Sequence, residues 1–167
     1  MLVGFVERLN VVKIEQIRLR PAAIGDLSWL FHLEQDEEGN RLAGTKPRSW
    51  EAFSEHFAQV LNDPRVTARV VLADRAVVGA ASVFEQDGAR FIGYRIAREH
   101  WGRGIATRAI ALLLAEVTAR PIRAQVAEHN IASARALIRN GFEVVSRAYS
   151  PATDRYTAGE VITFVLC

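Results

Sequence analysis

The sequence is poor in the residues that build cross-links and metal centres. Its 167 residues include one cysteine, Cys167, at the last position. A single thiol excludes an internal disulfide framework and a zinc site made of several cysteines, and it fits the reducing cytoplasm. Four histidines are far apart and lack metal-ligand spacing, so we interpret them as surface or helix-end residues and expect no metal: His32, His56, His100 and His129.

Long hydrophobic runs and a strong charge of one sign are also missing. The apolar N-terminal run meets Glu7 and Arg8 too early for the core of a signal peptide, and no later run is long enough to cross a bilayer. A net charge of +2, with its arginines dispersed, is too weak to argue for nucleic acid. These absences predict a cytoplasmic protein without membrane or nucleic-acid partners.

The length, together with the lack of repeats, linkers and low-complexity tracts, predicts one mixed α/β domain over residues 17–167. Residues 1–16 would form either an N-terminal arm or an extra strand. Alternating segments predict strands and apolar residues at helical spacing predict helices, in the order βααβββαβαββ. The predicted strands are 17–20, 66–73, 76–84, 91–96, 122–127, 143–149 and 161–167. The four helices follow Asp26, Ser49, Gly104 and Asn130.

The segment from Trp101 to Thr107 is the most informative part of the chain. Gly102, Gly104 and Ala106 alternate there, directly before an apolar-periodic segment that is expected to end near Arg120. Such a corner leaves the N–H groups of the first helical turn open to a ligand, and the helix dipole favours a phosphate there. The alternative is tight helix–strand packing, for which glycine is common. Three arginines add positive charge around the corner: Arg98, Arg103 and Arg108.

Two phosphate-binding motifs do not fit this corner. A dinucleotide fingerprint G-x-G-x-x-G needs a third glycine where the chain has Thr107, and it is expected in an opening βαβ unit. A P-loop needs a lysine that does not follow either glycine. The remaining interpretation is the pyrophosphate-binding corner of the GNAT N-acetyltransferases, [RQ]-x-x-G-x-[GA]. The segment Trp101–Ala106 resembles it, with Trp101 where the pattern prefers Arg or Gln.

A second motif strengthens this resemblance. Asn130-x-x-Ser133 is followed by Asn140-Gly141-Phe142, and Ile92–Ile96 runs into the corner. Both motifs resemble the GNAT branch that includes the ribosomal-protein N-terminal acetyltransferases, and the resemblance covers most of the chain from residue 17. It implies a GNAT-like fold: a central, mostly antiparallel twisted sheet with a parallel, splayed strand pair, flanked by about four helices.

The resemblance also implies a cosubstrate, a reaction and binding residues. Acetyl-CoA would donate its acetyl group directly to a primary amine, of a small molecule or a peptide N-terminus, within a ternary complex. Pyrophosphate would lie on the Gly-rich corner and pantetheine would run between the splayed strands. The residues implied in binding coenzyme A are Ile96, Gly102, Arg103, Gly104, Ala106, Thr107 and Asn130.

Three side chains are candidates for proton transfer. Many GNATs place a tyrosine acid four residues before the Gly-Phe pair, where this chain has Leu137. Ser133 stands where the ribosomal-protein branch has a serine proposed to protonate the departing thiolate; the alternative is a serine that only satisfies local backbone. Glu85, at a strand end, and Glu128, beside the splay, are candidate bases. Both could equally be solvated carboxylates, with the amine proton leaving through water.

The acceptor is less defined than the donor. The acidic stretch Glu34–Arg41 is expected to be a loop whose charge attracts a cationic amine such as a polyamine, an aminoglycoside or a peptide N-terminus, or else a plain solvated loop. An aromatic stripe at Trp50, Phe53 and Phe57 is interpreted as core, with a substrate-facing wall as the alternative. A competing function is a non-catalytic acyl-CoA-binding or regulatory module on the same scaffold. The sequence fits a monomer and a homodimer alike.

Overall fold

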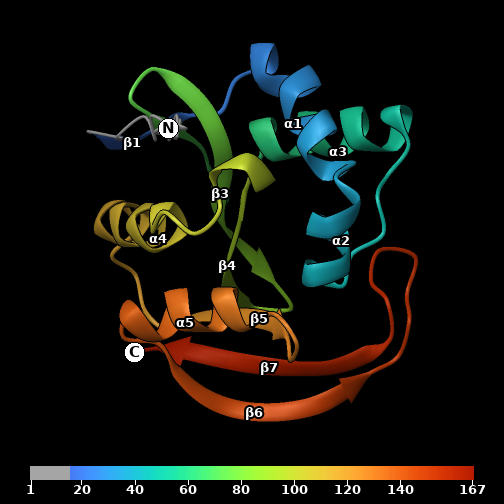
Figure 1. The fold of residues 1–167 in the computed structure, drawn as a ribbon, viewed down its shortest axis with the longest axis vertical. Coiled ribbons are helices and arrows are strands. Elements are labelled where there is room, and N and C mark those ends of the chain that lie inside the picture. The colour runs from blue at the N-terminus through green and yellow to red at the C-terminus, as the bar shows by residue number, and fades with distance from the viewer. Residues whose placement is uncertain (1–15) are drawn as a thin grey trace, which may run out of the picture.

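A seven-stranded sheet runs through the computed structural model, which describes residues 16–167 (Figure 1). Its strand order is β1-β2-β3-β4-β5-β7-β6. Neighbouring strands are antiparallel except β4 and β5, which run parallel and confirm the expected sheet. The strands are β1 (Ile17–Pro21), β2 (Thr67–Ala73), β3 (Ala76–Gln86), β4 (Ala89–Ile96), β5 (Ile122–Ala127), β6 (Glu143–Ser150) and β7 (Gly159–Leu166). The expected N-terminal arm or strand lies, apart from Gln16, outside the described residues.

Within the described residues five α-helices accompany the sheet, one more than the sequence predicted: α1 (Leu27–Glu34), α2 (Glu37–Ala43), α3 (Trp50–Asn62), α4 (Ile105–Glu116) and α5 (Ile131–Arg139). The caps expected for α3 and α5 are confirmed, because Ser49 accepts a hydrogen bond from the Ala52 N–H and Asn130 from the Ser133 N–H. Asp26 occupies the N-cap position of α1, as expected, but its side chain makes no capping hydrogen bond to this helix. Its carboxylate instead binds the Arg20 guanidinium and the Ala23 N–H.

The additional helix, α2, occupies the acidic stretch that was expected to be a loop. Asp36 caps it by accepting a hydrogen bond from the Gly39 N–H at 2.7 Å, and Gly44 ends it with φ of +64°. The prediction was wrong because so short and polar a segment has no helical hydrophobic period. Its helix signals are the two caps, the acidic Glu37 and Glu38 in the first turn and Arg41 in the last turn.

Two other boundaries differ from expectation. Helix α4 ends at Glu116 rather than near Arg120, because β-branched Val117 and Thr118 disfavour helix and the residue before a proline avoids the helical region. Strands β3 and β4 extend to a two-residue turn at Asp87 and Gly88, which have φ of 51° and 74°. A turn of that type matches the twist of a hairpin, so the strands continue to its edge.

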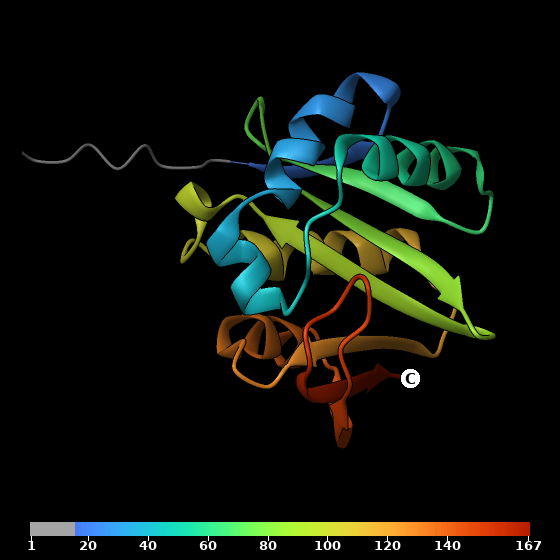
Figure 2. The ribbon, with the colours of Figure 1, turned by 90° about the vertical axis from the view of Figure 1, so that its right-hand side faces the viewer.

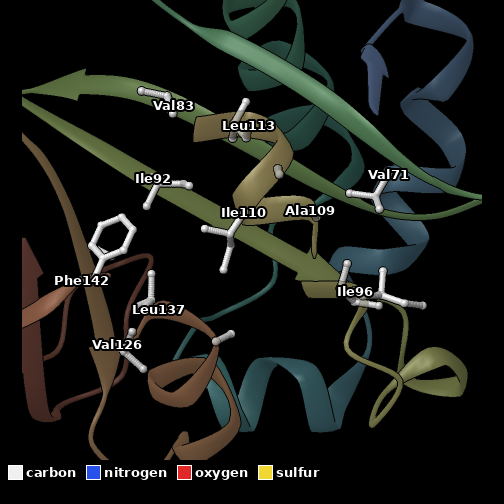
Figure 3. Packing of buried hydrophobic residues seen from close by; sticks show 14 of the residues in the cluster. Val71, Val83, Ile92, Ile96, Ala109, Ile110, Leu113, Val126, Leu137 and Phe142 are labelled. Carbon is white, nitrogen blue, oxygen red and sulfur yellow. The ribbon is translucent and has the colours of Figure 1, made fainter. Parts of the chain in front are cut away.

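The two faces of the sheet carry separate hydrophobic cores. On one face, Ile110 of α4 and Leu137 of α5 are fully buried among residues of the central strands (Figure 3). On the other face lie α1 and α3 (Figure 2). Adjacent Val70 and Val71 on β2, both 0% exposed, belong to different cores because side chains alternate across a strand. The buried residues of the second core are Leu30, Phe53, Phe57 and Val70, so most of the aromatic stripe is core.

The loop between β6 and β7 reaches back to the segment that follows α2 (Figure 2). The Lys46 N–H donates to the Arg155 carbonyl at 2.8 Å, and the Thr157 N–H donates to the Gly44 carbonyl at 2.9 Å. These contacts join the C-terminal hairpin to the N-terminal helices. They also hold Arg155 beside the cavity described next.

Candidate active site

The parallel strand pair opens into a cavity. In the described chain, β4 and β5 are paired at a single position, Phe91 with Arg123. The cavity that begins where the strands separate has a volume of about 680 Å³ and is lined by residues of β3, β4, β5, α3 and the β6–β7 loop. A cavity of this size suits a small molecule or part of a larger one.

The Gly-rich corner lies between β4 and α4. Gly102 and Gly104 adopt φ of +73° and +74°, and a Cβ on either would meet no heavy atom within 4 Å. No side chain caps α4, so the N–H groups of its first turn, at Ile105 and Ala106, keep their donors for a ligand. Arg103 is exposed at the corner, whereas Arg98 lies 3.1 Å from the Asp36 carboxylate. The backbone here fits a phosphate.

Trp101 has a structural role that the motif pattern did not reveal. Its indole N–H donates a hydrogen bond to the Ile96 carbonyl at 2.7 Å, which ties the corner to the last residue of β4. A carbonyl oxygen has two lone pairs, so the Ile96 carbonyl retains one acceptor site. The Trp101 side chain therefore helps to order the corner.

Ser133 meets a hydroxyl from the opposite side of the splay. The Ser133 Oγ and Tyr94 Oη atoms are 2.6 Å apart, and both residues line the cavity. The Ser133 N–H donates to the Asn130 side chain at 3.3 Å. In the described contacts, the Ser133 hydroxyl thus bonds to Tyr94 rather than to its own helix. Burial raises the pKa of Tyr94 to about 12, so its phenol stays protonated at neutral pH.

Sequence reasoning missed Tyr94, although the residue lies within the quoted Ile92–Ile96 motif. Leu137, at the position of the family's tyrosine, is 0% exposed and belongs to the core. Strand β4 therefore brings a tyrosine hydroxyl to Ser133, whereas α5 has no tyrosine at the family's position. The signal that could have found it is the alternation of side chains along a strand. This alternation places the Tyr94 side chain on the opposite face of the strand from its sequence neighbours, toward the splay.

The two candidate carboxylate bases are not brought to Ser133. Glu85 lies 3.4 Å from Arg90 and lines a separate small pocket. Glu128 lies 3.2 Å from Arg147 and is exposed. Neither is among the residues that line the large cavity.

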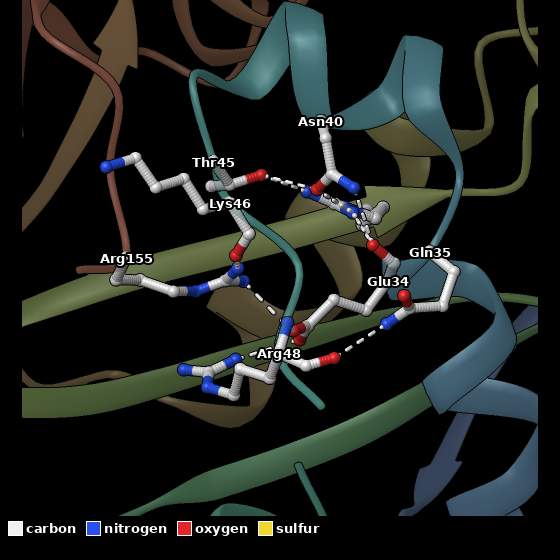
Figure 4. Close-up of polar contacts among 8 residues, drawn as sticks. Glu34, Gln35, Asn40, Thr45, Lys46, Arg48 and Arg155 are labelled. Carbon is white, nitrogen blue, oxygen red and sulfur yellow. Dashed lines mark hydrogen bonds and ion pairs between the residues drawn. The ribbon is translucent and has the colours of Figure 1, made fainter. Parts of the chain in front are cut away.

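The far end of the cavity contains a buried carboxylate held by arginines (Figure 4). Glu34 is 7% exposed and accepts two hydrogen bonds from Arg48, one from its N–H and one from its Nη1, each at 2.8 Å. Arg155 Nη2 lies 3.4 Å from the same carboxylate, and its Nη1 donates to the Lys46 carbonyl. Asp36, Glu37 and Glu38 of the acidic stretch are not among the residues that line the cavity, whereas Glu34 is. Its buried carboxylate faces the cavity already paired.

Two further basic groups border this end. Arg95 on β4 binds neutral oxygens, the Asn40 Oδ1 at 3.1 Å and the Thr45 Oγ1 at 2.8 Å. Burial lowers the pKa of Arg95, and the charge of Arg155 lowers it further. His56 is a surface residue of α3, as expected, and lines the cavity. Partial burial and then the charge of Arg48 lower its pKa, so the imidazole is neutral at pH 7.

Within residues 16–167 no three or more His, Cys, Asp or Glu side chains gather closely enough to hold a metal ion. In the same part of the chain no helix has the length and apolar character of a membrane span.

Three solved structures with a similar fold are named as acetyltransferases. The spermidine N-acetyltransferase from Vibrio cholerae, determined with CoA and spermine, has a TM-score of 0.79 and 19% identity, covering 90% of this chain and 95% of that one. The ribosomal L7/L12 alpha-N-protein acetyltransferase, in complex with CoA, has a TM-score of 0.75 and 17% identity, covering 91% and 94%. The microcin C7 self-immunity acetyltransferase, with acetyl-CoA and AMP, has a TM-score of 0.74 and 16% identity, covering 91% and 92%.

Comparison of the amino-acid sequence gives two results. No curated protein sequence matches the chain. The family profile described as acetyltransferase (GNAT) domain matches residues 16–143, which include the splay, the Gly-rich corner and α5. This match spans well over half of the 167 residues. The chain therefore belongs to the GNAT acetyltransferase family.

Proposed function

We propose that residues 17–167 form an N-acetyltransferase that transfers an acetyl group from acetyl-CoA to a primary amine by direct transfer in a ternary complex in the cytoplasm. One observation carries this proposal: a single cavity joins the β4–β5 splay, the Tyr94–Ser133 hydroxyl pair and a pocket of charged side chains. Membership of the GNAT family supports acetyl transfer as the reaction.

The corner and the splay are the proposed binding site of coenzyme A. The N–H groups from Gly102 to Thr107 would bind the pyrophosphate, with Arg103 adding positive charge. Backbone groups near Ile96 and the side chain of Asn130 would flank the pantetheine. Acetyl-CoA supplies the acetyl group as a reactive thioester. The left-handed glycines, the uncapped first turn and the open space beside both glycines fit this group.

Ser133 is the proposed proton donor on the thiol side, and Tyr94 is the residue proposed to position it. The Ser133 Oγ would give its proton to the departing sulfur and regain one from water, while the Tyr94 phenol holds the serine through the hydrogen bond between the two hydroxyls. Because burial raises its pKa to about 12, the phenol stays protonated at neutral pH and would position Ser133 without giving up its own proton. Since Glu85 and Glu128 lie outside the cavity, we propose that the amine proton leaves through water.

An acceptor panel tests the function. Thiol release from acetyl-CoA is measured with a set of primary amines, and each acetylated product is identified by mass. Turnover with at least one amine, with a product heavier by one acetyl group, is the expected result. Acetyl-CoA binding without thiol release for any acceptor would instead identify a non-catalytic acyl-CoA-binding module.

A further inference from the structure

The acceptor end of the cavity has an excess of positive charge. Three arginines, Arg48, Arg95 and Arg155, line it together with one carboxylate, Glu34, which leaves a net charge of +2. The other charged side chains of the cavity wall have partners of their own. Arg69 lies 2.7 Å from Glu116 and Asp63 lies 2.9 Å from Arg65.

Two of these arginines present hydrogen-bond donors to the cavity. Side-chain exposure is 24% for Arg48 and 26% for Arg155, compared with 8% for Glu34. A guanidinium has about five N–H donors in a planar fork. The contacts in the described chain use Nη1 of Arg48, and Nη1 and Nη2 of Arg155. Both side chains therefore retain donors after they have bound Glu34, and Glu34 sets the position of the two forks.

The backbone holds this pair in place. Arg155 belongs to the β6–β7 loop, which is hydrogen-bonded to the segment after α2 at Lys46 and Gly44. Arg48 is anchored by both its backbone N–H and its guanidinium. A preorganised pair of guanidinium groups matches a carboxylate or phosphate, which it can bind through several charge-assisted hydrogen bonds. The lowered pKa values of Arg95, Arg155 and His56 are in part caused by neighbouring arginine charges and agree with this positive field.

We infer that the acceptor is an amine whose molecule also carries an anionic group, a carboxylate or a phosphate, which Arg48 and Arg155 bind. The inference rests on the proposed acetyltransferase function. Because Tyr94 and Ser133 line the same cavity, the anionic end would lie near Glu34 while the amine reaches the hydroxyl pair. A purely cationic acceptor such as a polyamine would meet three arginines and only one, already paired, carboxylate. This end of the cavity therefore selects against it.

Matched acceptors test the inference. Leucine is compared with leucinamide for the carboxylate, phosphoethanolamine with ethanolamine for the phosphate, and spermidine is the polycation. We expect kcat/KM to be about 10- to 100-fold higher for the anionic member of at least one pair, the effect of one or two charge-assisted hydrogen bonds. Equal or better use of the members without an anionic group, or of spermidine, would overturn the inference while leaving acetyl transfer intact.

Binding is measured beside the rates so that the two proposals fail separately. The same five compounds are titrated calorimetrically into the protein with CoA present. If no amine is acetylated, the proposed function fails, yet preferential binding of the anionic members would still support the anion site. Absence of any preference in both binding and rate contradicts it.

The Arg155→Gln variant locates the site, and Arg90→Gln is its matched control. Arg90 is 29% exposed and lies 3.4 Å from Glu85, much as Arg155 is 26% exposed and lies 3.4 Å from Glu34, but it is outside the cavity. Arg155→Gln should raise the KM or Kd of the anionic member about 10- to 100-fold and leave the values for the member without an anionic group and for acetyl-CoA unchanged.

A purely structural role for Arg155 has a different signature. In that case Arg155→Gln would weaken the binding of both members of a pair equally and lower the midpoint of thermal unfolding. That result would refute the inference. Arg155→Lys keeps the charge but loses the fork, so it should recover part of the preference for the anion. The control Arg90→Gln should change neither the ratio of KM values nor the ratio of Kd values within a pair of acceptors.

Discussion

Substitution of a corner glycine gives a stringent test of where coenzyme A binds. Gly104 begins α4 with φ of +74°, and Gly88 in the β3–β4 turn has the same φ of +74°. A Cβ would meet no heavy atom within 4 Å at either position. Tryptophan at each site should therefore cost the fold a similar amount, about 1–2 kcal/mol for a left-handed non-glycine residue. Only at Gly104 would the indole occupy the space proposed for the pyrophosphate.

The size of the effect follows from the donors at the corner. Each backbone N–H bonded to a charged oxygen contributes about 1.5–3 kcal/mol. If the indole of Gly104→Trp displaces the phosphate from two such donors, binding weakens by about 3–6 kcal/mol, which is roughly 10²- to 10⁴-fold in Kd. Gly88→Trp should bind acetyl-CoA as the unaltered protein does.

Calorimetric titration with acetyl-CoA measures both variants, and thermal unfolding checks that they lose similar stability. If Gly104→Trp binds acetyl-CoA as tightly as Gly88→Trp does, the corner is not the pyrophosphate site. A selective loss of stability in Gly104→Trp would instead mean that the corner is packed more tightly than the structure shows. The comparison therefore separates a binding role from a backbone role for the same glycine.

Two further predictions concern proton transfer and pH. Ser133→Ala and Tyr94→Phe should each lower kcat about 10²-fold or more with little change in the KM for acetyl-CoA, because a general acid and the residue that positions it act on the chemical step. Steady-state kinetics measures both constants. An effect confined to KM would contradict the proposed role. Hydrogen bonds from Arg20 hold the pKa of Asp26 below its usual value. The stability from this pair is therefore present above the unfolded-state pKa of about 3.9 and is lost as pH falls through the lower folded-state pKa. Asp26→Asn should lower the free energy of unfolding at pH 7 by about 1–3 kcal/mol and weaken the dependence of that free energy on pH in the acid range. Chemical denaturation across pH 2–7 measures both. An unchanged dependence at acid pH would contradict the role of the Arg20–Asp26 pair.

Local signals predicted most of the fold. Alternating strands gave the sheet, and the caps at Ser49 and Asn130 gave two helix starts, because each signal lies within a few residues of the structure it determines. The Gly-rich corner was recognised for the same reason. Helix α2 was missed because it has no hydrophobic period, and only its caps and the charged residues of its end turns mark it.

The site contacts could not be read from the sequence because they join distant segments. Tyr94 and Ser133 are 39 residues apart, and Arg155 and Lys46 are 109 apart. Which side chains meet at such separations depends on how helices and loops pack over the splay, and a single sequence does not specify that arrangement locally. The candidate bases Glu85 and Glu128 illustrate the same limit, since both lie close in sequence to elements that border the cavity while their side chains do not line it.

The role of Glu34 changes most between sequence and structure. In the sequence it begins an acidic stretch, and an acidic stretch beside an amine-binding site predicts attraction of a cation. In the structure the carboxylate is buried and holds Arg48 and Arg155, so its charge is compensated and the side that faces the cavity is guanidinium. A carboxylate that positions two arginines produces the opposite selectivity from a carboxylate that is free. The same residue therefore supports an anionic acceptor, and the charge of a stretch predicts its ligand only after the partner of each carboxylate is known.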